Sequence, residues 1–385
     1  MKRLIFILLL YFLATNLCGQ DKVTLPSVVN YSQKDYSSAS QNFDVCQNSK
    51  GIMYFANTSG LLEYDGSNWR KKNIPNSQLV SLDIDNEDII YTGGNGEIGL
   101  FKSDSTGELI YQSLTSIIPE ENKSFGYVWN VIAFDNKVYF NCFKYIFVYE
   151  NGKITTIQPN SEGTHLMFKV QDELLLTDKT KGVFRLNNSK LNFIPNSDIF
   201  IGKSIFSIIK KENGNYLIGT REKGIYELDP NNSSNCKMFN PTLSETLGNS
   251  ILYCGIRLKN GNLCYGTITN GVFITNPKGN IIHHISRNEG LNTEAVLKLY
   301  QNSFGQVWCG LDNGISQINI NSSFTFRKEG NGFSGGIQHL LIANKILYLA
   351  TSQGVYYSYI GKNDSLKEEF NDISKVEGFK GQALY

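Results

Sequence analysis

The sequence has almost no excess of charge of either sign. It contains 36 Lys and Arg residues against 35 Asp and Glu residues, which gives a net charge of +1 at pH 7. Proteins that bind nucleic acids or anionic membrane surfaces usually carry a clear basic excess. The composition therefore gives no indication of nucleic acid or of a membrane surface as a partner of this segment.

Histidine is scarce, with four residues, His165, His283, His284 and His339, in a chain of 385. His283 and His284 fall in a predicted strand, where neighbouring side chains point to opposite faces and do not easily share one ion. The sequence therefore predicts no metal site and no cofactor.

Catalytic motifs are lacking as well. No Gly-x-Ser-x-Gly elbow stands on a strand-to-helix turn, and the glycine-rich segment 93–96 joins two predicted strands instead of opening a helix. The adjacent carboxylates Glu120 with Glu121, and Glu368 with Glu369, lie in polar loops, where such pairs are usually solvated. We therefore predict no catalytic residues in this chain.

Long apolar runs are limited to the N-terminus. A basic start, Met1 to Arg3, precedes the apolar run Leu4 to Leu13 and the polar segment Ala14 to Gln20. This order is typical of a secretory signal peptide, predicted over residues 1–20, and the run is too short to favour the alternative of a retained membrane anchor. Cys18 suggests a lipoprotein signal, but Leu17 before it is bulkier than that processing prefers. We expect a periplasmic protein.

Cysteines are few and scattered after the signal segment. Their spacing matches neither a metal site nor a disulfide framework. Cys254 and Cys264 lie on neighbouring predicted strands and form the one pair to test for a bridge, but free buried thiols are favoured. The six residues are Cys46, Cys142, Cys236, Cys254, Cys264 and Cys309.

What the sequence does contain is a repeat. The segment Gly51 to Asp65 reads as a strand, a tight turn and a second strand, since an aromatic and β-branched run is followed by Asn-Thr-Ser-Gly and another apolar run. The same pattern returns seven more times. The residues that close the first strand of each hairpin are 36 to 48 positions apart; they are Ala56, Gly93, Asn141, Thr177, Gly219, Gly266, Gly310 and Ala350.

A β-only repeat of this length predicts an all-β fold, a β-propeller of four-stranded antiparallel blades. Further strands are predicted before and after most hairpins. The predicted units lie near 43–73, 79–114, 128–158, 165–194, 205–239, 251–286, 295–328 and 337–359. Whether seven or eight of them close one ring stays open.

Two segments flank the repeats at 43–360. The lead-in, residues 21–42, is expected either to lie across one face of the propeller or to supply a closing strand. Residues 361–385 are expected to form a polar connector, helical in part, and the truncated start of a further repeat whose last residues lack strand partners. We infer from this that the chain is a fragment of a longer receptor.

The lead-in and the first hairpin carry a more specific signal. The phrases Tyr-Ser-x-x-Asp-Tyr at Tyr31, Gly-Ile-Met-Tyr-Phe-Ala-Asn at Gly51 and Gly-Leu-Leu-Glu-Tyr-Asp-Gly at Gly60 resemble the periplasmic sensor region of Bacteroidetes regulators with two-component-regulator propeller repeats. The chain departs from that pattern at Phe43, where a tryptophan is usual, and at Ser37, Ser38 and Ser40, where glycines are usual.

The resemblance implies a non-enzymatic receptor that senses a small ligand, such as an oligosaccharide, outside the cytoplasm and acts on transcription. Its membrane helix and its output domain, a histidine kinase or a helix-turn-helix domain, would lie in C-terminal parts that this chain does not contain. The resemblance also allows a homodimer of the full-length receptor. The alternative is an exported propeller enzyme, a lyase or glycosidase, or a free-standing carbohydrate-binding or scaffold protein.

Ligand-binding residues are not fixed by the sequence. Loops at the faces of a propeller converge near its central channel. Candidates in the turns of the hairpins are Arg221, Glu222, Lys223, Lys179 to Lys181, Asn270, Asp312 and Asn313. Trp69, Trp129 and Trp308 could stack on a sugar, but Trp129 and Trp308 lie in predicted strands and are expected in the core.

Overall fold

The structure is a computed structural model. It describes residues 26–75, 78–159, 164–187, 189–231, 236–320, 333–360 and 370–373, and for residues 164 and 165 only the backbone. A compact unit, Pro26–Ser322, holds seven four-stranded antiparallel sheets, and an eighth sheet belongs to a second unit. The signal peptide expected at residues 1–20 lies outside the described residues.

The first three sheets of the ring follow the chain directly. They are β2 (Asn42–Gln47), β3 (Met53–Asn57), β4 (Gly60–Tyr64) and β5 (Trp69–Lys72); β6 (Leu79–Ile84), β7 (Ile90–Gly94), β8 (Ile98–Ser103) and β9 (Leu109–Ser113); and β10 (Val128–Phe134), β11 (Lys137–Cys142), β12 (Ile146–Glu150) and β13 (Lys153–Ile157).

The next three sheets repeat this order. They are β14 (Thr164–Val170), β15 (Glu173–Asp178), β16 (Gly182–Asn187) and β17 (Lys190–Phe193); β18 (Ile205–Lys210), β19 (Tyr216–Thr220), β20 (Gly224–Leu228) and β21 (Cys236–Met238); and β22 (Leu252–Arg257), β23 (Leu263–Thr267), β24 (Val272–Thr275) and β25 (Ile281–Ile285).

The seventh sheet joins the two ends of the ring. β26 (Val296–Gln301), β27 (Val307–Leu311) and β28 (Ile315–Asn319) take their fourth strand from the lead-in, β1 (Ser27–Tyr31), which pairs with β28 from Ser27 with Asn319 to Tyr31 with Ile315. Of the two expectations for the lead-in, the structure therefore shows the closing strand.

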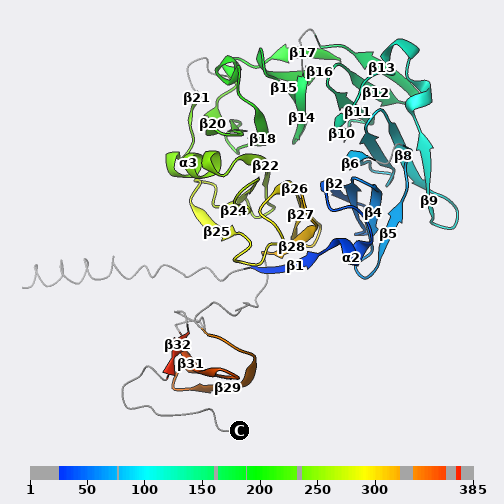
Figure 1. Ribbon diagram of the computed structural model, residues 1–385. Coiled ribbons are helices and arrows are strands. Elements are labelled where there is room, and N and C mark those ends of the chain that lie inside the picture. The colour runs from blue at the N-terminus through cyan, green and yellow to red at the C-terminus, as the bar shows by residue number, and fades with distance from the viewer. Residues whose placement is uncertain are drawn as a thin grey trace, which may run out of the picture. The chain divides into compact units, whose positions relative to one another are not determined.

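The seven sheets form one ring. Their first strands contact one another in the order β26, β2, β6, β10, β14, β18, β22 and back to β26, and Figure 1 shows them around a central axis with the outer strands at the rim. The predicted all-β propeller is confirmed, and the number of blades in the ring is seven.

Each hairpin turn needs a residue that can leave the strand sharply. Gly60 begins β4 with φ +129°, and a Cβ atom there would lie 2.5 Å from the Lys72 carbonyl oxygen. Only glycine accepts both conditions, because it has no side chain and populates positive φ freely. The turn chemistry seen in the sequence therefore also sets how closely β5 approaches the hairpin.

The hydrophobic core is divided among the boundaries between sheets. Seven buried clusters each draw residues from two neighbouring sheets. The cluster between the first and seventh sheets is rich in aromatic rings: Trp308 packs on Phe55 and on Tyr31, the latter at 5.7 Å between ring centroids and 12° between planes. Burial of apolar area between sheets thus stabilises the ring as a whole.

Polar side chains also link the first strands of neighbouring sheets. Asp44 Oδ2 accepts a hydrogen bond from the backbone nitrogen of Leu82 at 3.2 Å, and Asp83 Oδ2 accepts one from Ala133 at 2.9 Å. Asn130 Oδ1 accepts one from Met167 at 2.8 Å. Hydrogen bonds are electrostatically stronger in a buried setting than in water, so these three contacts help to fix the spacing of the blades.

Helices are few in the described part of the chain. They are α2 (Gln33–Tyr36), α3 (Pro241–Asn249) and the 3-10 turns η1 (Thr115–Ile117), η2 (Glu120–Asn122) and η3 (Ser197–Phe200). Helix α3 was not predicted from the sequence. Asn240 caps this helix by accepting a hydrogen bond from the Leu243 nitrogen at 3.1 Å, and Leu243 and Leu247 are buried on one side of it.

The second unit contains the eighth predicted hairpin. β29 (Ile337–Ala343), β30 (Ile346–Thr351), β31 (Gly354–Tyr359) and β32 (Asn371–Asp372) form one sheet. The connector was expected to be partly helical, but Asn371–Asp372 pairs with β31 as a short strand because its backbone completes the sheet edge. Residues 361–369 and 374–385, where the rest of the connector and the truncated repeat were expected, lie outside the described residues.

Candidate functional site

Every first strand of the ring begins with a β-bulge. In β2, for example, Asn42 pairs with Asn57 and Asp44 with Ala56, so Phe43 is an extra residue without a partner. The same shift occurs in the other six sheets. Bulges often re-aim a side chain next to a functional site.

The extra residues form what we call the collar. In six sheets they are apolar or aromatic: Phe43, Val80, Trp129, Phe206, Tyr253 and Leu297. In the fourth sheet the irregularity falls between Thr164 and Met167 and includes His165 and Leu166. The face of the ring on which the first strands begin is termed the collar face.

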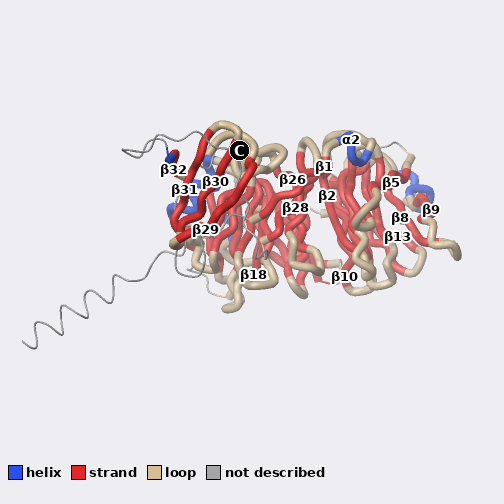
Figure 2. Tube along the Cα trace, turned by 90° about the horizontal axis from the view of Figure 1, so that it is seen from below, coloured by secondary structure: helices blue, strands red, loops and turns tan. Residues whose placement is uncertain are grey.

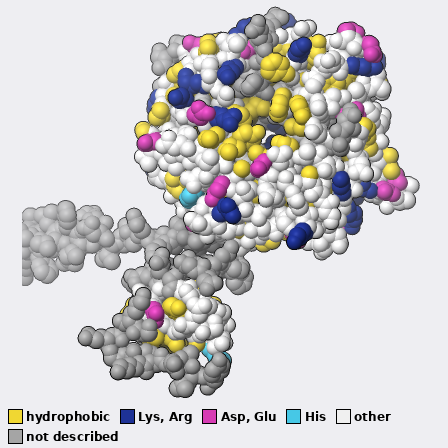
Figure 3. Space-filling view, in the orientation of Figure 1, with side chains coloured by type: hydrophobic (Ala, Val, Ile, Leu, Met, Phe, Trp, Pro, Cys, Tyr) yellow, Lys and Arg dark blue, Asp and Glu magenta, His cyan; other side chains and the backbone are white. Residues whose placement is uncertain are grey.

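The described collar residues other than the buried Val80 are partly exposed although they belong to the innermost strands. Trp129 is 44 % exposed, and Phe206, Tyr253, Phe43 and Leu297 are half-buried. Figure 3 shows hydrophobic side chains gathered around a hollow at the centre of the ring on the face turned to the viewer. That face carries α2, which lies at the upper edge in Figure 2. The mouth of the central channel is therefore apolar.

Contacts within the collar cross sheet boundaries. The rings of Phe206 and Tyr253, from the fifth and sixth sheets, lie 4.8 Å apart, and the Arg221 guanidinium lies 5.7 Å from the centre of the Phe206 ring. Burial raises the pKa of Tyr253, and the Arg221 charge offsets part of that rise. On the third sheet, Trp129 packs on Tyr127 at 5.5 Å. The aromatic faces thus come with a cation and a phenol hydroxyl beside them.

A polar belt lies next to the collar. The residue that follows each collar residue is polar in the first, second, third, fifth and seventh sheets: Asp44, Ser81, Asn130, Ser207 and Lys298. Lys298 Nζ and Asp44 Oδ1 are 2.8 Å apart, although they come from opposite ends of the ring's sequence. Desolvation works against the charge of Lys298, but Asp44 outweighs it and raises the pKa of the ammonium group.

The solvent exposure of the Lys298 side chain shows that it borders the central channel. Its side chain is 39 % exposed although it belongs to an innermost strand, β26, and its ammonium group pairs with Asp44. The side chain therefore lines the central channel and is not part of a packed core. Asp83, another first-strand residue, has its pKa raised by desolvation, because burial disfavours the charged carboxylate.

The predicted turn candidates all lie on the collar face, because each follows the second strand of a sheet. Arg221, Glu222 and Lys223 are exposed, and Lys179 to Lys181 and Asp312 with Asn313 are exposed as well. Asp312 accepts a hydrogen bond from Gln41 Nε2 at 2.6 Å. Asn270 is half-buried and its carbonyl oxygen is 2.9 Å from His284 Nε2. Of these candidates, the structure places Arg221 against a collar ring.

The three tryptophans have three different surroundings. Trp308 is 2 % exposed and belongs to the core, as expected. Trp69 is half-buried and packs on Tyr64 at 4.5 Å at the closure of the ring. Trp129 was expected in the core, and this was wrong: it is exposed because the bulge in β10 turns it out of the inter-sheet packing.

Histidine and cysteine build no site in the described residues. His284 stacks on Phe273 at 4.3 Å in an outer strand pair, and burial lowers the pKa of its neighbour His283. His165 belongs to β14, but its side chain is not described. The six cysteines after the signal segment, Cys254 and Cys264 among them, are thiols and not disulfides, and the described residues hold no group of three metal-binding side chains.

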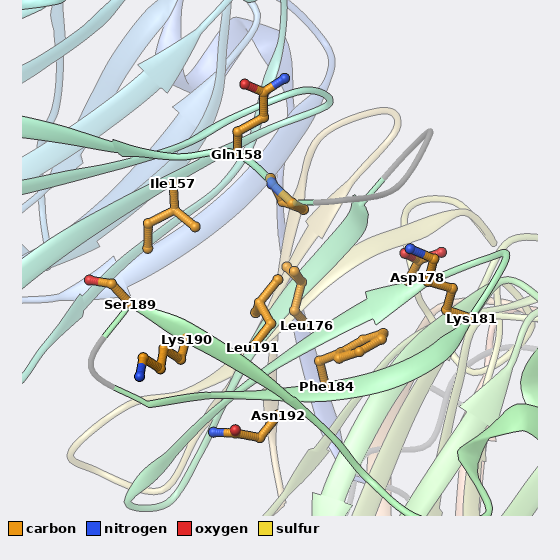
Figure 4. Close-up of a pocket in the computed structure, with 11 residues that line it drawn as sticks. Ile157, Gln158, Leu176, Asp178, Lys181, Phe184, Ser189, Lys190, Leu191 and Asn192 are labelled. Atoms are coloured by element: carbon orange, nitrogen blue, oxygen red, sulfur yellow. The ribbon is translucent and has the colours of Figure 1, made fainter.

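Cavities away from the collar are found between neighbouring sheets. On the face opposite the collar, a cleft of about 800 Å³ lies between the second and third sheets, with Tyr91, Tyr149 and Lys169 among its walls. A cavity of about 440 Å³ lies between the third and fourth sheets. Figure 4 shows Leu176, Phe184 and Leu191 in this cavity, with Asp178 and Lys181 beside each other at one end. The two cavities show that the inter-sheet boundaries are not filled evenly.

The arrangement at the collar is suited to holding a ligand. Its described surface offers aromatic faces, hydroxyl and amide groups and one guanidinium group, which can hold a ring-shaped ligand by stacking and hydrogen bonds. Two apolar residues followed by a polar one at the start of several first strands, such as Val128-Trp129-Asn130 and Ile205-Phe206-Ser207, were the signal in the sequence that could have located it. No described helix is long and apolar enough to span a membrane.

Comparison with known proteins identifies relatives by fold. No protein-family model and no curated protein matches the chain. Among solved structures, the extracellular domain of the hybrid two-component system protein BT3049 from B. thetaiotaomicron matches with a TM-score of 0.64 and 19 % identity over 90 % of this chain and 49 % of that one. The extracellular domain of BT4673 from the same organism gives 0.58 and 17 % over 91 % and 47 %.

A lyase structure is also similar. Streptogramin B lyase matches with a TM-score of 0.60 and 12 % identity over 78 % of this chain and 100 % of that one. The chain spans about half the length of the two extracellular domains, at 49 % and 47 %. The resemblance seen in the sequence is thus confirmed in fold: the chain is similar to the propeller region of Bacteroides two-component sensor proteins.

Proposed function

We propose that this chain is the ligand-binding propeller of an extracytoplasmic signal-transduction receptor that regulates transcription. The ligand is a glycan fragment or another breakdown product of a polymer, and it is bound without being converted. The observation that carries the proposal is the collar, a partly exposed ring of apolar and aromatic side chains above a polar belt, on a fold similar to that of two-component sensor domains.

The chemistry of the collar suits a sugar ring. The C–H face of a pyranose is apolar and flat, so it packs on an aromatic face, while its hydroxyls need hydrogen-bonding groups at the edge. Trp129 with Tyr127, and Phe206 with Tyr253, give two aromatic pairs in the mouth of one channel. The Tyr127 hydroxyl donates to Gln78 Oε1 at 2.8 Å, which places an amide beside the first pair.

Binding is tested directly with the purified chain. We expect the Tm to rise in the presence of a bound oligosaccharide, by an amount that grows with ligand concentration, because a ligand that binds only the folded state stabilises it. A panel of neutral and acidic tetrasaccharides, each at millimolar concentration, serves as the probe. Trp129→Ala should remove the shift and Trp69→Phe should keep it. A panel that leaves the Tm unchanged would refute the proposal.

The alternative is an exported propeller enzyme, which the similarity to streptogramin B lyase favours. It requires a base or an acid near the bound ligand, and His165 in β14 is the histidine whose backbone belongs to an innermost strand of the ring. Mass spectrometry of each tetrasaccharide after long incubation with the chain separates the two functions. Intact sugars support the receptor, whereas products that disappear with His165→Ala establish the enzyme.

A further inference from the structure

The exposed charges on the collar face are unevenly distributed. The turns between the second and third strands carry the exposed cations Lys144, Lys179, Arg221 and Lys223 in the third, fourth and fifth sheets, against one exposed anion, Glu222. Lys181 is left out of this set because it lies beside Asp178 (Figure 4). This group of four cations is called the basic sector.

The corresponding turns of the other sheets have no such cations. In the first and sixth sheets they consist of uncharged residues, and in the second the carboxylate of Glu97 is buried and accepts hydrogen bonds from Tyr111 and Thr115 at 2.8 and 2.9 Å. The seventh has exposed Asp312. The connections between sheets on this face carry charges of both signs: exposed Glu120 and Glu121 after the second sheet, Asp198 and Lys203 after the fourth, and exposed Glu245 in α3 after the fifth. The excess of exposed cations is therefore limited to the hairpin turns of the third, fourth and fifth sheets.

The basic sector touches the aromatic collar at Arg221. Its guanidinium group lies 5.7 Å from the centre of the Phe206 ring, and its distance to the Glu222 carboxylate is 4.0 Å, with both side chains exposed at 44 % and 66 %. A surface pair of that length neutralises little charge. Arg221 can therefore still bind an anionic group of a ligand that lies on Phe206 and Tyr253, and a guanidinium does so with two parallel hydrogen bonds.

Resting on the proposed function, we infer that the ligand is an anionic saccharide, with carboxylate or sulfate groups on its rings. The sugar rings stack on Phe206, Tyr253 and Trp129, and the acidic groups face the basic sector, with Arg221 as the direct partner. The acidic groups of the saccharide are attracted to the basic sector and not to the other hairpin turns of the mouth, which are neutral or acidic. This difference in charge sets the direction in which the saccharide lies across the mouth.

Titration calorimetry of the whole chain tests the inference with four probes: tetragalacturonate, a chondroitin sulfate tetrasaccharide, neutral cellotetraose and tetraglutamate. We expect one of the two anionic saccharides to bind at least tenfold more tightly than cellotetraose and tetraglutamate. Its affinity should fall as NaCl rises from 50 to 500 mM, because exposed charges are screened over a few ångströms at that ionic strength. Chondroitin sulfate carries both uronate carboxylates and sulfates, so tight binding of tetragalacturonate would assign the contact to carboxylates, whereas tight binding of chondroitin sulfate alone would assign it to sulfate.

Variants locate the contact. Arg221→Gln should weaken the anionic saccharide about tenfold or more, and Arg221→Lys should restore part of the loss. Lys153→Gln, which removes an exposed cation on outer strand β13, is the matched control and should bind as the unmodified chain. Equal affinity of Arg221→Gln and the unmodified chain would overturn the assignment.

The remaining outcomes separate this inference from the proposed function. Tight binding of cellotetraose that is lost in Trp129→Ala would leave the receptor function standing and refute the anionic ligand. Tetraglutamate binding as tightly as the saccharides would show that the face selects charge alone, which refutes the saccharide. Failure of every probe would refute both.

Discussion

Trp308 offers the sharpest test of how the ring is held closed. Its side chain is 2 % exposed and lies at the boundary of the first and seventh sheets, with the rings of Tyr31, Phe55 and Tyr64 each within 5.7 Å between centroids. Tyr31 comes from the closing strand β1. Loss of the indole therefore weakens the boundary that brings the two ends of the ring together.

The magnitude follows from the packing. Trp308→Ala removes a fully buried aromatic side chain, which typically lowers the free energy of unfolding by about 3 to 5 kcal/mol. Trp308→Phe should behave differently, because the indole Nε1 has no hydrogen-bond partner among the described residues. Replacing it by a phenyl ring removes an unpaired buried donor, worth about 1 to 3 kcal/mol, and so offsets the lost packing. We expect a net change of about 1 kcal/mol or less.

Urea unfolding followed by far-UV circular dichroism suits both variants, because the signal comes mainly from the backbone and does not require the tryptophan that is replaced. Trp129→Ala is the control: its side chain is 44 % exposed, and its removal should change the free energy of unfolding by about 0.5 kcal/mol or less. The reasoning is refuted if Trp308→Phe costs as much as Trp308→Ala, or if Trp129→Ala costs as much as either.

Three further predictions concern the channel, the ring closure and the thiols. Desolvation raises the pKa of Asp83, so the contribution of this residue to the free energy of unfolding is complete below its unfolded pKa and is lost as the pH rises through its folded pKa. In urea titrations, Asp83→Asn should therefore become more stable relative to the unmodified chain as the pH rises from 4 to 7. A difference in stability that stays constant over this range would contradict the prediction. A Cβ atom on Gly310 would lie 2.6 Å from the Asn42 carbonyl oxygen. Gly310→Ala should therefore lower the Tm and reduce the free energy of unfolding by about 1 to 3 kcal/mol. Gly336 has open space around it, so Gly336→Ala should leave the Tm unchanged. Cys236 is half-buried and the other five described cysteines are buried, so iodoacetamide should label Cys236 first in the native chain, and rapid labelling of all six would show that the packing is wrong.

The hairpins could be predicted from the sequence because their information is local. Gly182-Val183-Phe184 after a turn, for instance, combines positive φ at the glycine with β-branched and aromatic residues that suit a strand. The outer strands β17 and β21 escaped prediction because they are short and polar, with Lys190 and Asn192 in the first and three residues in the second. Edge strands like these are defined by the neighbouring strand more than by their own residues.

Long-range features were harder to predict. The lead-in could not be assigned to one of two roles because the partner of Ser27 is Asn319, at the other end of the ring. Helix α3 did leave a signal, Asn240 and Pro241 followed by Leu243 and Leu247 at helical spacing, but a repeat made of strands outweighed it. The collar was missed because a bulge inserts one residue and shifts the alternation of inward and outward side chains, so Trp129 was counted with the buried set.

Because Ser27 pairs with Asn319, the closing strand β1 has to wait during synthesis until its partner strand has been made. At ribosomal rates of about 5 to 20 residues per second, β1 leaves the ribosome roughly 15 to 60 s before its partner has been made. During that interval the nascent protein has an unpaired strand at each end of a growing arc of blades, and such edges invite association with other chains. A chaperone that covers the early edge, or passage across a membrane before the arc can close, would keep the two ends available for each other.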